Sequence, residues 1–294
     1  MTNPIFSSQS VRWIDKIHAF IQLFRLSFAL LAAAAGSAAV YALNPALPLQ
    51  AYILTGIILA CMTSAACAIN DYYDVEKDRI NHPERPLPSG HLSLQFAWWS
   101  AVILFALALI SAVPLGSYLF FLVTISIILL WYYSPLLNYS GVLGNLLVAT
   151  IIALLIFLSS LAADRPFALL YPMFFLFCYS LAREIVWDVH DAEGDQSQGV
   201  MTIANQWGVQ TAFGIVWGLI GIMVVSMPIA ITLSPMVHPL WFAGCSSLML
   251  LNLIIALIPY QRQTRETTYQ QLVFWERLGM VLGVIGLLGA APPL

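Results

Sequence analysis

The chain has 294 residues, of which 61% are hydrophobic and 9% are charged, and its formal net charge is −3. A mean hydropathy of +0.86 excludes an ordinary soluble globular domain and indicates a polytopic membrane protein. The small negative charge, with no basic tail, argues against nucleic-acid binding. No low-complexity segment divides the sequence, so we expect one domain over residues 1–294.

Apolar runs of about 20 residues, long enough to cross a hydrocarbon core roughly 30 Å thick, recur along the whole chain. We therefore predict an all-α bundle of nine transmembrane helices. The fourth run is shorter than the others, so that helix is expected to be tilted or partly interfacial. The predicted spans are Phe20–Leu43, Ala51–Tyr73, Leu94–Val113, Tyr118–Tyr133, Val142–Ala162, Ala168–Val186, Thr211–Leu233, Pro239–Pro259 and Leu272–Ala290.

The basic residues set the expected orientation, because Lys and Arg in short loops remain on the cytoplasmic side. With the N-terminus inside, ten of the eleven basic residues fall on or near the cytoplasmic face, and only Arg165 falls outside. We predict an integral, multi-pass protein with a cytoplasmic N-terminus and an external C-terminus. In a bacterium it would lie in the inner membrane.

A charged segment, residues 70–90 with the sequence NDYYDVEKDRINHPERPLPSG, follows the second apolar run directly. If the helix continues beyond the membrane, Asn70, Asp74 and Asp78 are spaced i, i+4 and i+8 and share one face. Three oxygen-bearing side chains would then line up at the membrane edge.

A second acidic segment, residues 183–199 with the sequence REIVWDVHDAEGDQSQG, follows the sixth apolar run. Its Asp188, Asp191 and Asp195 are spaced i, i+3 and i+7 and again stack on one side of a helix. Four predicted helices lie between the ends of the two runs, so both segments should face the cytoplasm. They would cap a single cytoplasm-facing cavity.

Carboxylates gathered at a partly dehydrated membrane edge repel one another and need a cation for compensation. Oxygen ligands without nearby cysteine suit Mg²⁺, which proteins commonly hold through carboxylates together with the phosphates of a substrate. The sequence thus predicts two acidic helix faces that hold Mg²⁺ and, through it, a diphosphate. The alternative is a pair of solvated loops of mixed charge. The repetition of the helical register at one membrane face favours the metal site.

These features resemble the UbiA superfamily of intramembrane prenyltransferases, and the resemblance extends over the whole chain. Two signatures carry it: NDxxDxxxD after the second helix and DxxxD after the sixth. The pattern REIxxDxxDxEGD is most similar to the branch that contains archaeal digeranylgeranylglyceryl phosphate synthase. The matching residues are Asn70, Asp71, Asp74 and Asp78 in the first signature, Arg85, Pro86 and Gly90 in the RPxxxG that follows, Asp191 and Asp195 in the second, and, more weakly, Arg25, Tyr133 and Asn145.

The resemblance implies Mg²⁺-dependent transfer of a prenyl group from a polyprenyl diphosphate, through an allylic carbocation, to a lipid-like or aromatic acceptor in contact with membrane lipid. Tyr133 would offer an aromatic face to the cation. Asn145 is an amide in an apolar run, where it is costly without a partner, so a substrate or metal contact is expected. The candidate residues are Asn70, Asp74, Asp78, Asp188, Asp191 and Asp195 for metal, Lys77, Arg79, Arg85 and Arg183 for diphosphate, and Arg85, Arg183, Asn145 and Tyr133 for catalysis.

One departure from the family pattern concerns position 187. Trp187 stands where that branch and many relatives have a lysine. Arg183 lies one helical turn earlier on the same face, and its planar guanidinium suits phosphate. We expect Arg183 to supply the missing positive charge.

Two other functions are open on the sequence alone. A terpene cyclase of the same superfamily would share the ionisation step but quench the cation within its own chain. A non-catalytic homologue would bind a prenyl lipid without turnover. Trp187 raises that second alternative, and the retained aspartates oppose it.

Overall fold

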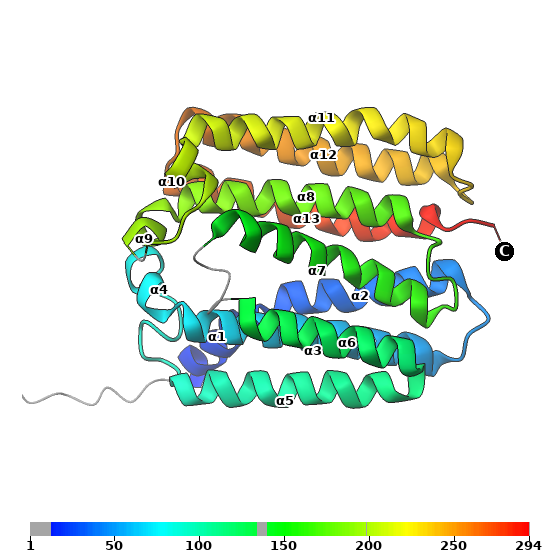
Figure 1. Ribbon diagram of the computed structural model, residues 1–294, viewed down its shortest axis with the longest axis horizontal. Coiled ribbons are helices and arrows are strands. Elements are labelled where there is room, and N and C mark those ends of the chain that lie inside the picture. Colours follow the sequence, from blue (N-terminus) through cyan, green and yellow to red (C-terminus); the bar gives the residue numbers. More distant parts are fainter. Residues whose placement is uncertain (1–12, 134–139, 198, 294) are drawn as a thin grey trace, which may run out of the picture.

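The computed structural model describes residues 13–133, 140–197 and 199–293. Over these residues the chain is all-α, as predicted, and its long helices run side by side in one bundle (Figure 1). Three short helices gather at one end of the bundle, and we call this the polar end: α4 (Val75–Asn81), α9 (Ala192–Ser197) and α10 (Ile203–Trp207).

Nine helices of 16 residues or more in the described part of the chain correspond to the nine predicted spans. Seven of them are long and apolar enough to cross a membrane. The exceptions are α6, which has only 16 residues, and α8, whose hydropathy is lowered by Arg183 and Glu184. An integral multi-pass membrane protein is thereby confirmed, whereas the count of nine spans stays a prediction. The nine are α2 (Leu26–Leu43), α3 (Leu49–Tyr73), α5 (Leu94–Ala112), α6 (Ser117–Tyr132), α7 (Gly141–Ala162), α8 (Leu170–His190), α11 (Val209–Leu233), α12 (Pro239–Arg262) and α13 (Glu266–Ala290).

The first predicted span, Phe20–Leu43, is wrong as a single helix. It is broken between α1 (Trp13–Leu23) and α2 at Arg25, which adopts the left-handed conformation with φ 41°. Such a conformation costs a non-glycine residue about 1–3 kcal/mol. Tertiary contacts hold it there, because Arg25 Nη2 lies 3.1 Å from Asp71 Oδ1 and Ser64 Oγ donates to the Phe24 carbonyl at 3.1 Å.

Two hydrophobic clusters of buried side chains form the core. The first is built mostly from α2, α3, α5 and α6, and the second mostly from α8, α11, α12 and α13. Helix α7 packs against both α2 and α8 and so links the two halves of the bundle (Figure 1). A space between the halves is therefore bounded by helices from both.

Helical register is kept where each acidic segment leaves the bundle. Asp74 separates α3 from α4, yet its N–H donates to the Asn70 carbonyl at 2.9 Å, and the Asp78 N–H donates to the Asp74 carbonyl at 2.8 Å. Likewise, Asp191 separates α8 from α9, and its carbonyl accepts from the Asp195 N–H at 3.1 Å. The predicted spacing of the acidic side chains along a helix is thus present in both segments.

Arg165 lies at the opposite end of the bundle, away from α4 and α9. Its guanidinium donates to the carbonyls of Leu43 at 3.3 Å, Pro292 at 3.2 Å and Pro293 at 3.0 Å. Arg165 therefore ties the end of α2 to the C-terminal segment. This placement agrees with the predicted separation of Arg165 from the other basic residues.

Candidate active site

A cavity of about 410 Å³ lies between the two halves of the bundle and reaches the polar end. Toward the interior its lining is apolar and includes Leu59, Met62, Phe175, Met249 and Leu287. Toward the polar end, charged side chains replace the apolar ones. An elongated molecule with an anionic head and an apolar body would match this division.

The cavity brings together nearly all the residues that the sequence suggested. Arg79 is the exception: its side chain is 58% exposed and lies 2.7 Å from Glu76 Oε2. Because Asp78 faces the cavity, the next residue on the same helix is turned about 100° away. The predicted role of Arg79 in diphosphate binding is therefore not supported. The predicted residues that line the cavity are Asn70, Asp74, Lys77, Asp78, Arg85, Tyr133, Asn145, Arg183, Asp188, Asp191 and Asp195.

Arg85 binds the carboxylate of Asp78 in the middle of α4. Arg85 Nη1 lies 2.7 Å from Asp78 Oδ1 and 3.8 Å from Asp71 Oδ1. Asp78 is only 2% exposed, and its other oxygen, Oδ2, is buried without a hydrogen-bond partner among the described residues. A buried carboxylate oxygen without a partner is costly, and an added cation would remove that cost.

Lys77 bridges the two acidic motifs. Its Nζ lies 3.5 Å from Asp74 Oδ2 and 3.2 Å from Asp195 Oδ1. Burial raises the pKa of both aspartates, and the positive charge of Lys77 opposes that rise. Burial alone would lower the pKa of Lys77, but the charges of Asp74 and Asp195 outweigh it and raise that pKa. The lysine therefore stays protonated between the two carboxylates.

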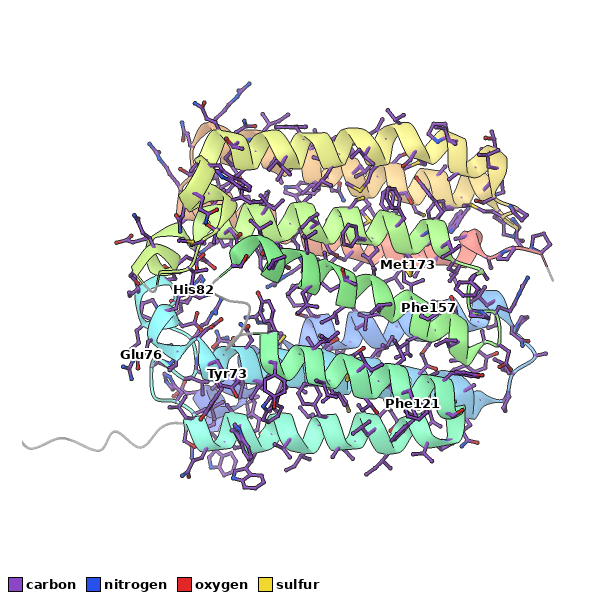
Figure 2. The ribbon with its side chains drawn as sticks, in the orientation of Figure 1. Tyr73, Glu76, His82, Phe121, Phe157 and Met173 are labelled. Carbon is purple, nitrogen blue, oxygen red and sulfur yellow. The ribbon has the colours of Figure 1, made fainter. Side chains whose placement is uncertain are left out.

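His82 contacts the remaining aspartate of the second motif and lies at the polar end (Figure 2). Its Nε2 is 3.1 Å from Asp191 Oδ1. Burial would raise the pKa of Asp191, but the hydrogen bond with His82 and the nearby positive charge of Arg85 lower it instead. The pKa of Asp191 thus lies below its usual value, whereas burial raises the pKa of Asp195 one turn later.

Asn145 finds its partner in the second acidic segment. Its Nδ2 on α7 donates to Asp188 Oδ2 on α8 at 2.7 Å. Asn145 is 3% exposed and its partner is a protein carboxylate, so the expected contact with substrate or metal stays a prediction. This bond fixes the Asp188 carboxylate at the cavity wall.

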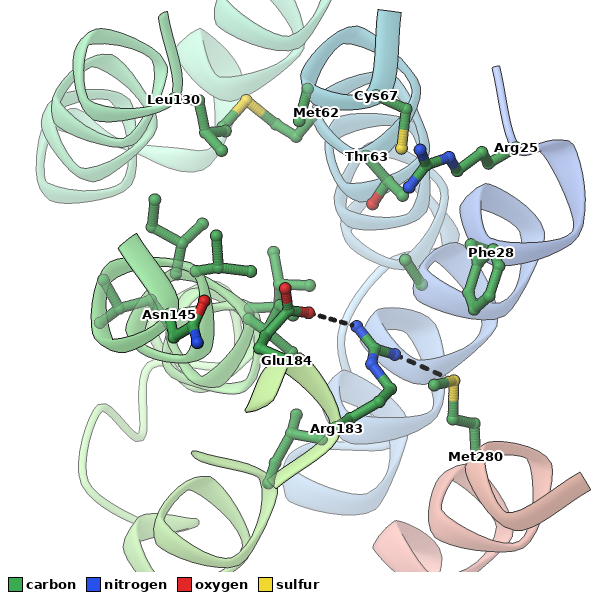
Figure 3. A pocket seen from close by; sticks show the side chains of 18 of the residues that line it. Arg25, Phe28, Met62, Thr63, Cys67, Leu130, Asn145, Arg183, Glu184 and Met280 are labelled. Atoms are coloured by element: carbon green, nitrogen blue, oxygen red, sulfur yellow. Dashed lines mark hydrogen bonds and ion pairs between the residues drawn. The ribbon is translucent and has the colours of Figure 1, made fainter. Parts of the chain in front are cut away.

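Arg183 lines the cavity from the side formed by α8 and α13 (Figure 3). Its Nη2 lies 3.1 Å from Glu184 Oε1, and its Nη1 donates weakly to Met280 Sδ at 3.7 Å. The guanidinium also lies 4.6 Å from the centre of the Trp187 ring. Trp187 Nε1 in turn donates to Glu276 Oε2 at 3.3 Å. Trp187 thus supports Arg183 by stacking.

The donor set fits a hard divalent cation. Six carboxylates and four cationic side chains line the cavity, which leaves a formal excess of two negative charges. No group of three or more His, Cys, Asp and Glu side chains within the described residues forms a ready-made metal cage. The motif carboxylates instead point at Lys77, His82 and Arg85. The charge excess, the unpartnered Asp78 oxygen and the oxygen-only donors together suit Mg²⁺.

Sequence reasoning missed two acidic residues near the site. Glu184 lines the cavity beside Arg183, and it could have been found because it belongs to the second acidic segment. Glu276 is 1% exposed within α13 and contacts Trp187. A charged residue inside a transmembrane span costs free energy and therefore marks a functional or structural site. The position of Glu276 within the last predicted span was the sequence signal that could have identified it.

Comparison with known proteins decides the family. The model of the UbiA prenyltransferase family matches residues 29–278, which include both acidic motifs. The chain belongs to this family of prenyltransferases. The predicted family is thereby confirmed.

Several curated relatives are archaeal digeranylgeranylglyceryl phosphate synthases. The enzyme of Saccharolobus solfataricus is 30% identical over 256 residues, which cover 84% of this chain and 87% of that one. The enzyme of Korarchaeum cryptofilum is 34% identical over 246 residues, which cover 79% and 84%. The enzyme of Sulfolobus acidocaldarius is 35% identical over 179 residues, which cover 60% of this chain and 65% of that one. The last match therefore spans slightly less than two thirds of the relative.

Solved structures share the fold at lower identity. The apo structure of a UbiA homologue from Aeropyrum pernix K1 has a TM-score of 0.70 at 18% identity and covers 89% of this chain and 97% of that one. A UbiA homologue from Archaeoglobus fulgidus, bound to GPP and Mg²⁺, has a TM-score of 0.67 at 18% identity and covers 91% and 99%. These likenesses support the helical membrane fold.

Proposed function

We propose that the protein transfers a prenyl group from a polyprenyl diphosphate to a lipid-like acceptor, with Mg²⁺ as its metal. One observation carries the proposal: both acidic motifs meet Lys77 and Arg85 at the polar end of one cavity whose remainder is apolar. Family membership supports prenyl transfer, and the GPP and Mg²⁺ bound by the Archaeoglobus fulgidus homologue support the donor and the metal.

Mg²⁺ would be held by the oxygen-bearing side chains of both motifs. When bound, Mg²⁺ compensates the negative charge that develops on the departing diphosphate as the allylic C–O bond breaks. Asp188, which Asn145 orients, would face the ligands of the first motif from α8. The proposed ligands are Asn70, Asp74, Asp78, Asp188, Asp191 and Asp195.

Lys77 and Arg85 are the cations placed to bind the diphosphate itself. Both line the cavity and already neutralise motif carboxylates. Arg85 offers a planar fork that suits phosphate oxygens, and Lys77 offers a compact charge. Arg183 would bind from the opposite wall, where stacking on Trp187 fixes its plane. The three donors would stabilise the leaving group from two sides.

The apolar part of the cavity would hold the prenyl chain and keep water from the cation. Leu59, Met62, Phe175 and Met249 supply that lining. Exclusion of water prevents hydrolysis of a reactive intermediate. Tyr133 lines the same cavity, and an aromatic face stabilises a nearby cation by about 0.5–2 kcal/mol.

For the acceptor, we propose a prenylated glycerol phosphate lipid. The names of the relatives, which are synthases of digeranylgeranylglyceryl phosphate, support this choice over an aromatic acceptor. We further propose that the polar end faces the cytoplasm, with the N-terminus inside and the C-terminus outside. The distribution of basic residues supports that orientation.

Product analysis tests the function. Purified protein in lipid nanodiscs is incubated with Mg²⁺, prenyl diphosphates of several lengths and either geranylgeranylglyceryl phosphate or a hydroxybenzoate, and the lipid extract is analysed by mass spectrometry. We expect a doubly prenylated glycerol phosphate. Cyclised hydrocarbon formed without acceptor would favour a terpene cyclase. No product with any donor would favour a non-catalytic prenyl-lipid binder.

A further inference from the structure

We infer that Asn81 is a positioning residue that holds the two acidic motifs in register. Asn81 is the last residue of α4, three positions after Asp78, and it reaches across to the junction of α8 and α9. The inference rests on the proposed metal-dependent function, because register matters only if both motifs serve one metal and diphosphate site. Asn81 itself lies outside the cavity lining.

The Asn81 carboxamide makes two hydrogen bonds to the backbone of the second motif. Its Nδ2 donates to the Asp191 carbonyl at 3.0 Å, and its Oδ1 accepts from the Gly194 N–H at 3.0 Å. The Gly194 N–H lies in the first turn of α9, where an amide has no partner within the helix. One side chain therefore satisfies this donor and fastens α4 to the end of α8.

The orientation of the amide is determined by its partners. A flipped Asn81 would place its NH₂ against the Gly194 N–H and its oxygen against the Asp191 carbonyl, so only the present assignment is compatible with both neighbours. The fit is also close. A Cβ added at Gly194 would overlap the Asn81 amide. An alanine at position 194 would therefore displace the Asn81 amide from its present place.

This link differs from the other bridges between the motifs. Lys77 and His82 contact the carboxylates of Asp195 and Asp191, which are the atoms that a metal would engage. Asn81 contacts only backbone atoms in these two bonds. Its bridge is therefore compatible with metal-bound carboxylates, and it can set their spacing in the free and the loaded protein. Supporting contacts of this kind typically contribute about 10–100-fold to metal affinity.

The test compares variants on both sides of the contact. Asn81→Ala removes both bonds, Asn81→Asp keeps the acceptor for Gly194 but turns an oxygen toward the Asp191 carbonyl, and Gly194→Ala introduces the clash. Asn205→Ala is the matched control, because Asn205 Nδ2 donates to the Ala192 carbonyl of α9 at 3.3 Å, in a bond that does not involve α4. The double variant Asn81→Ala/Gly194→Ala completes the set.

The readout is the affinity for Mn²⁺ in the absence of substrate, measured by electron paramagnetic resonance, alongside the thermal unfolding midpoint. We expect Asn81→Ala, Asn81→Asp and Gly194→Ala each to weaken Mn²⁺ binding on the order of 10-fold or more. The Asn205→Ala variant should bind like wild type. The double variant should bind no more weakly than Asn81→Ala, because removal of the amide makes room for the new Cβ.

The Mn²⁺ affinities separate the inference from the proposed function. If the parent protein binds Mn²⁺ and either Asn81→Ala or Asn81→Asp binds it equally tightly, the inference is overturned and the proposed function stays intact. Equal losses in Asn205→Ala, or fully additive losses in the double variant, would reduce Asn81 to a general structural contact and also overturn it. Absence of Mn²⁺ binding in the parent protein would overturn this inference, which requires the two motifs to form a metal site before substrate arrives, whereas the proposed function, in which the diphosphate supplies further ligands, would stand.

Discussion

At the scale of single residues, helix α4 places two neighbouring carboxylates in opposite environments. Asp78 is 2% exposed, lines the cavity and is bound by Arg85. Glu76, two positions earlier, is exposed and paired with Arg79 at 2.7 Å. The same short helix therefore offers a candidate metal ligand and a matched surface residue.

Asp78→Asn should reduce diphosphate release on the order of 10²-fold or more. Asparagine keeps the shape of the side chain but removes the negative charge that would bind the metal. Glu76→Gln should leave release within about twofold of wild type, since exposed ion pairs contribute little. Initial rates of diphosphate release from a prenyl diphosphate measure both. Equal activity of the two variants would remove Asp78 from the site.

The two arginines Arg183 and Arg79 provide a second matched comparison. Arg183 lines the cavity and stacks on Trp187, whereas Arg79 is exposed on α4. Arg183→Ala should reduce turnover on the order of 10²-fold, as expected for the loss of one donor to developing charge. Arg79→Ala should be nearly silent. The kinetics should also show partial rescue of Arg183→Ala by Trp187→Lys. An active Arg183→Ala variant would contradict the proposed compensation for the missing lysine.

At the scale of elements, the break between α1 and α2 depends on Arg25, whose backbone has a positive φ. Glycine tolerates that conformation and alanine does not. Both Arg25→Gly and Arg25→Ala lose the contact with Asp71, so their difference isolates the backbone. Arg25→Gly should therefore be more stable than Arg25→Ala by about 1 kcal/mol. Thermal unfolding in detergent compares them, and an advantage for alanine would contradict the left-handed assignment.

The long helices could be predicted from sequence because each is an apolar run of membrane-spanning length. Hydropathy does not record a local break, so the apolar stretch across Arg25 predicted one continuous helix where two exist. That break depends on Asp71 and Ser64, which lie far away in sequence. Information of this kind becomes available only when the helices are packed.

The acidic residues of the site could be predicted because their spacing places them on one helical face. The sequence could not distinguish Arg79 from Lys77, since both are basic residues on the same seven-residue helix. Their separation depends on which face of α4 meets α9, and Lys77 is the one that contacts Asp195. Asn81 was missed for the same reason, because its partners are backbone atoms more than 100 positions later.

At the scale of the whole molecule, the two hydrophobic clusters enclose a cavity whose charged side chains lie at one end. The proposed orientation places that end in the cytoplasm. Single cysteines at Ile80, Ser197 and Ala46, in a background in which the four native cysteines are replaced by alanine, test it by labelling from either side of sealed vesicles. Residues 80 and 197 should label from the cytoplasmic side and residue 46 from the other. Opposite sides for 80 and 197 would contradict the single-cavity arrangement.

The central claim is that both acidic motifs act as one Mg²⁺-dependent site. Its most direct test is diphosphate release by wild type, Asp74→Asn, Asp195→Asn and the double variant, each with EDTA and with Mg²⁺ restored. The account predicts that EDTA abolishes diphosphate release by wild type and that Mg²⁺ restores it. It also predicts that the double variant releases diphosphate as fast as the slower of the two single variants, because the effects of residues that act as a unit are non-additive. Release that persists in EDTA, or losses in the two single variants that multiply in the double variant, would contradict it.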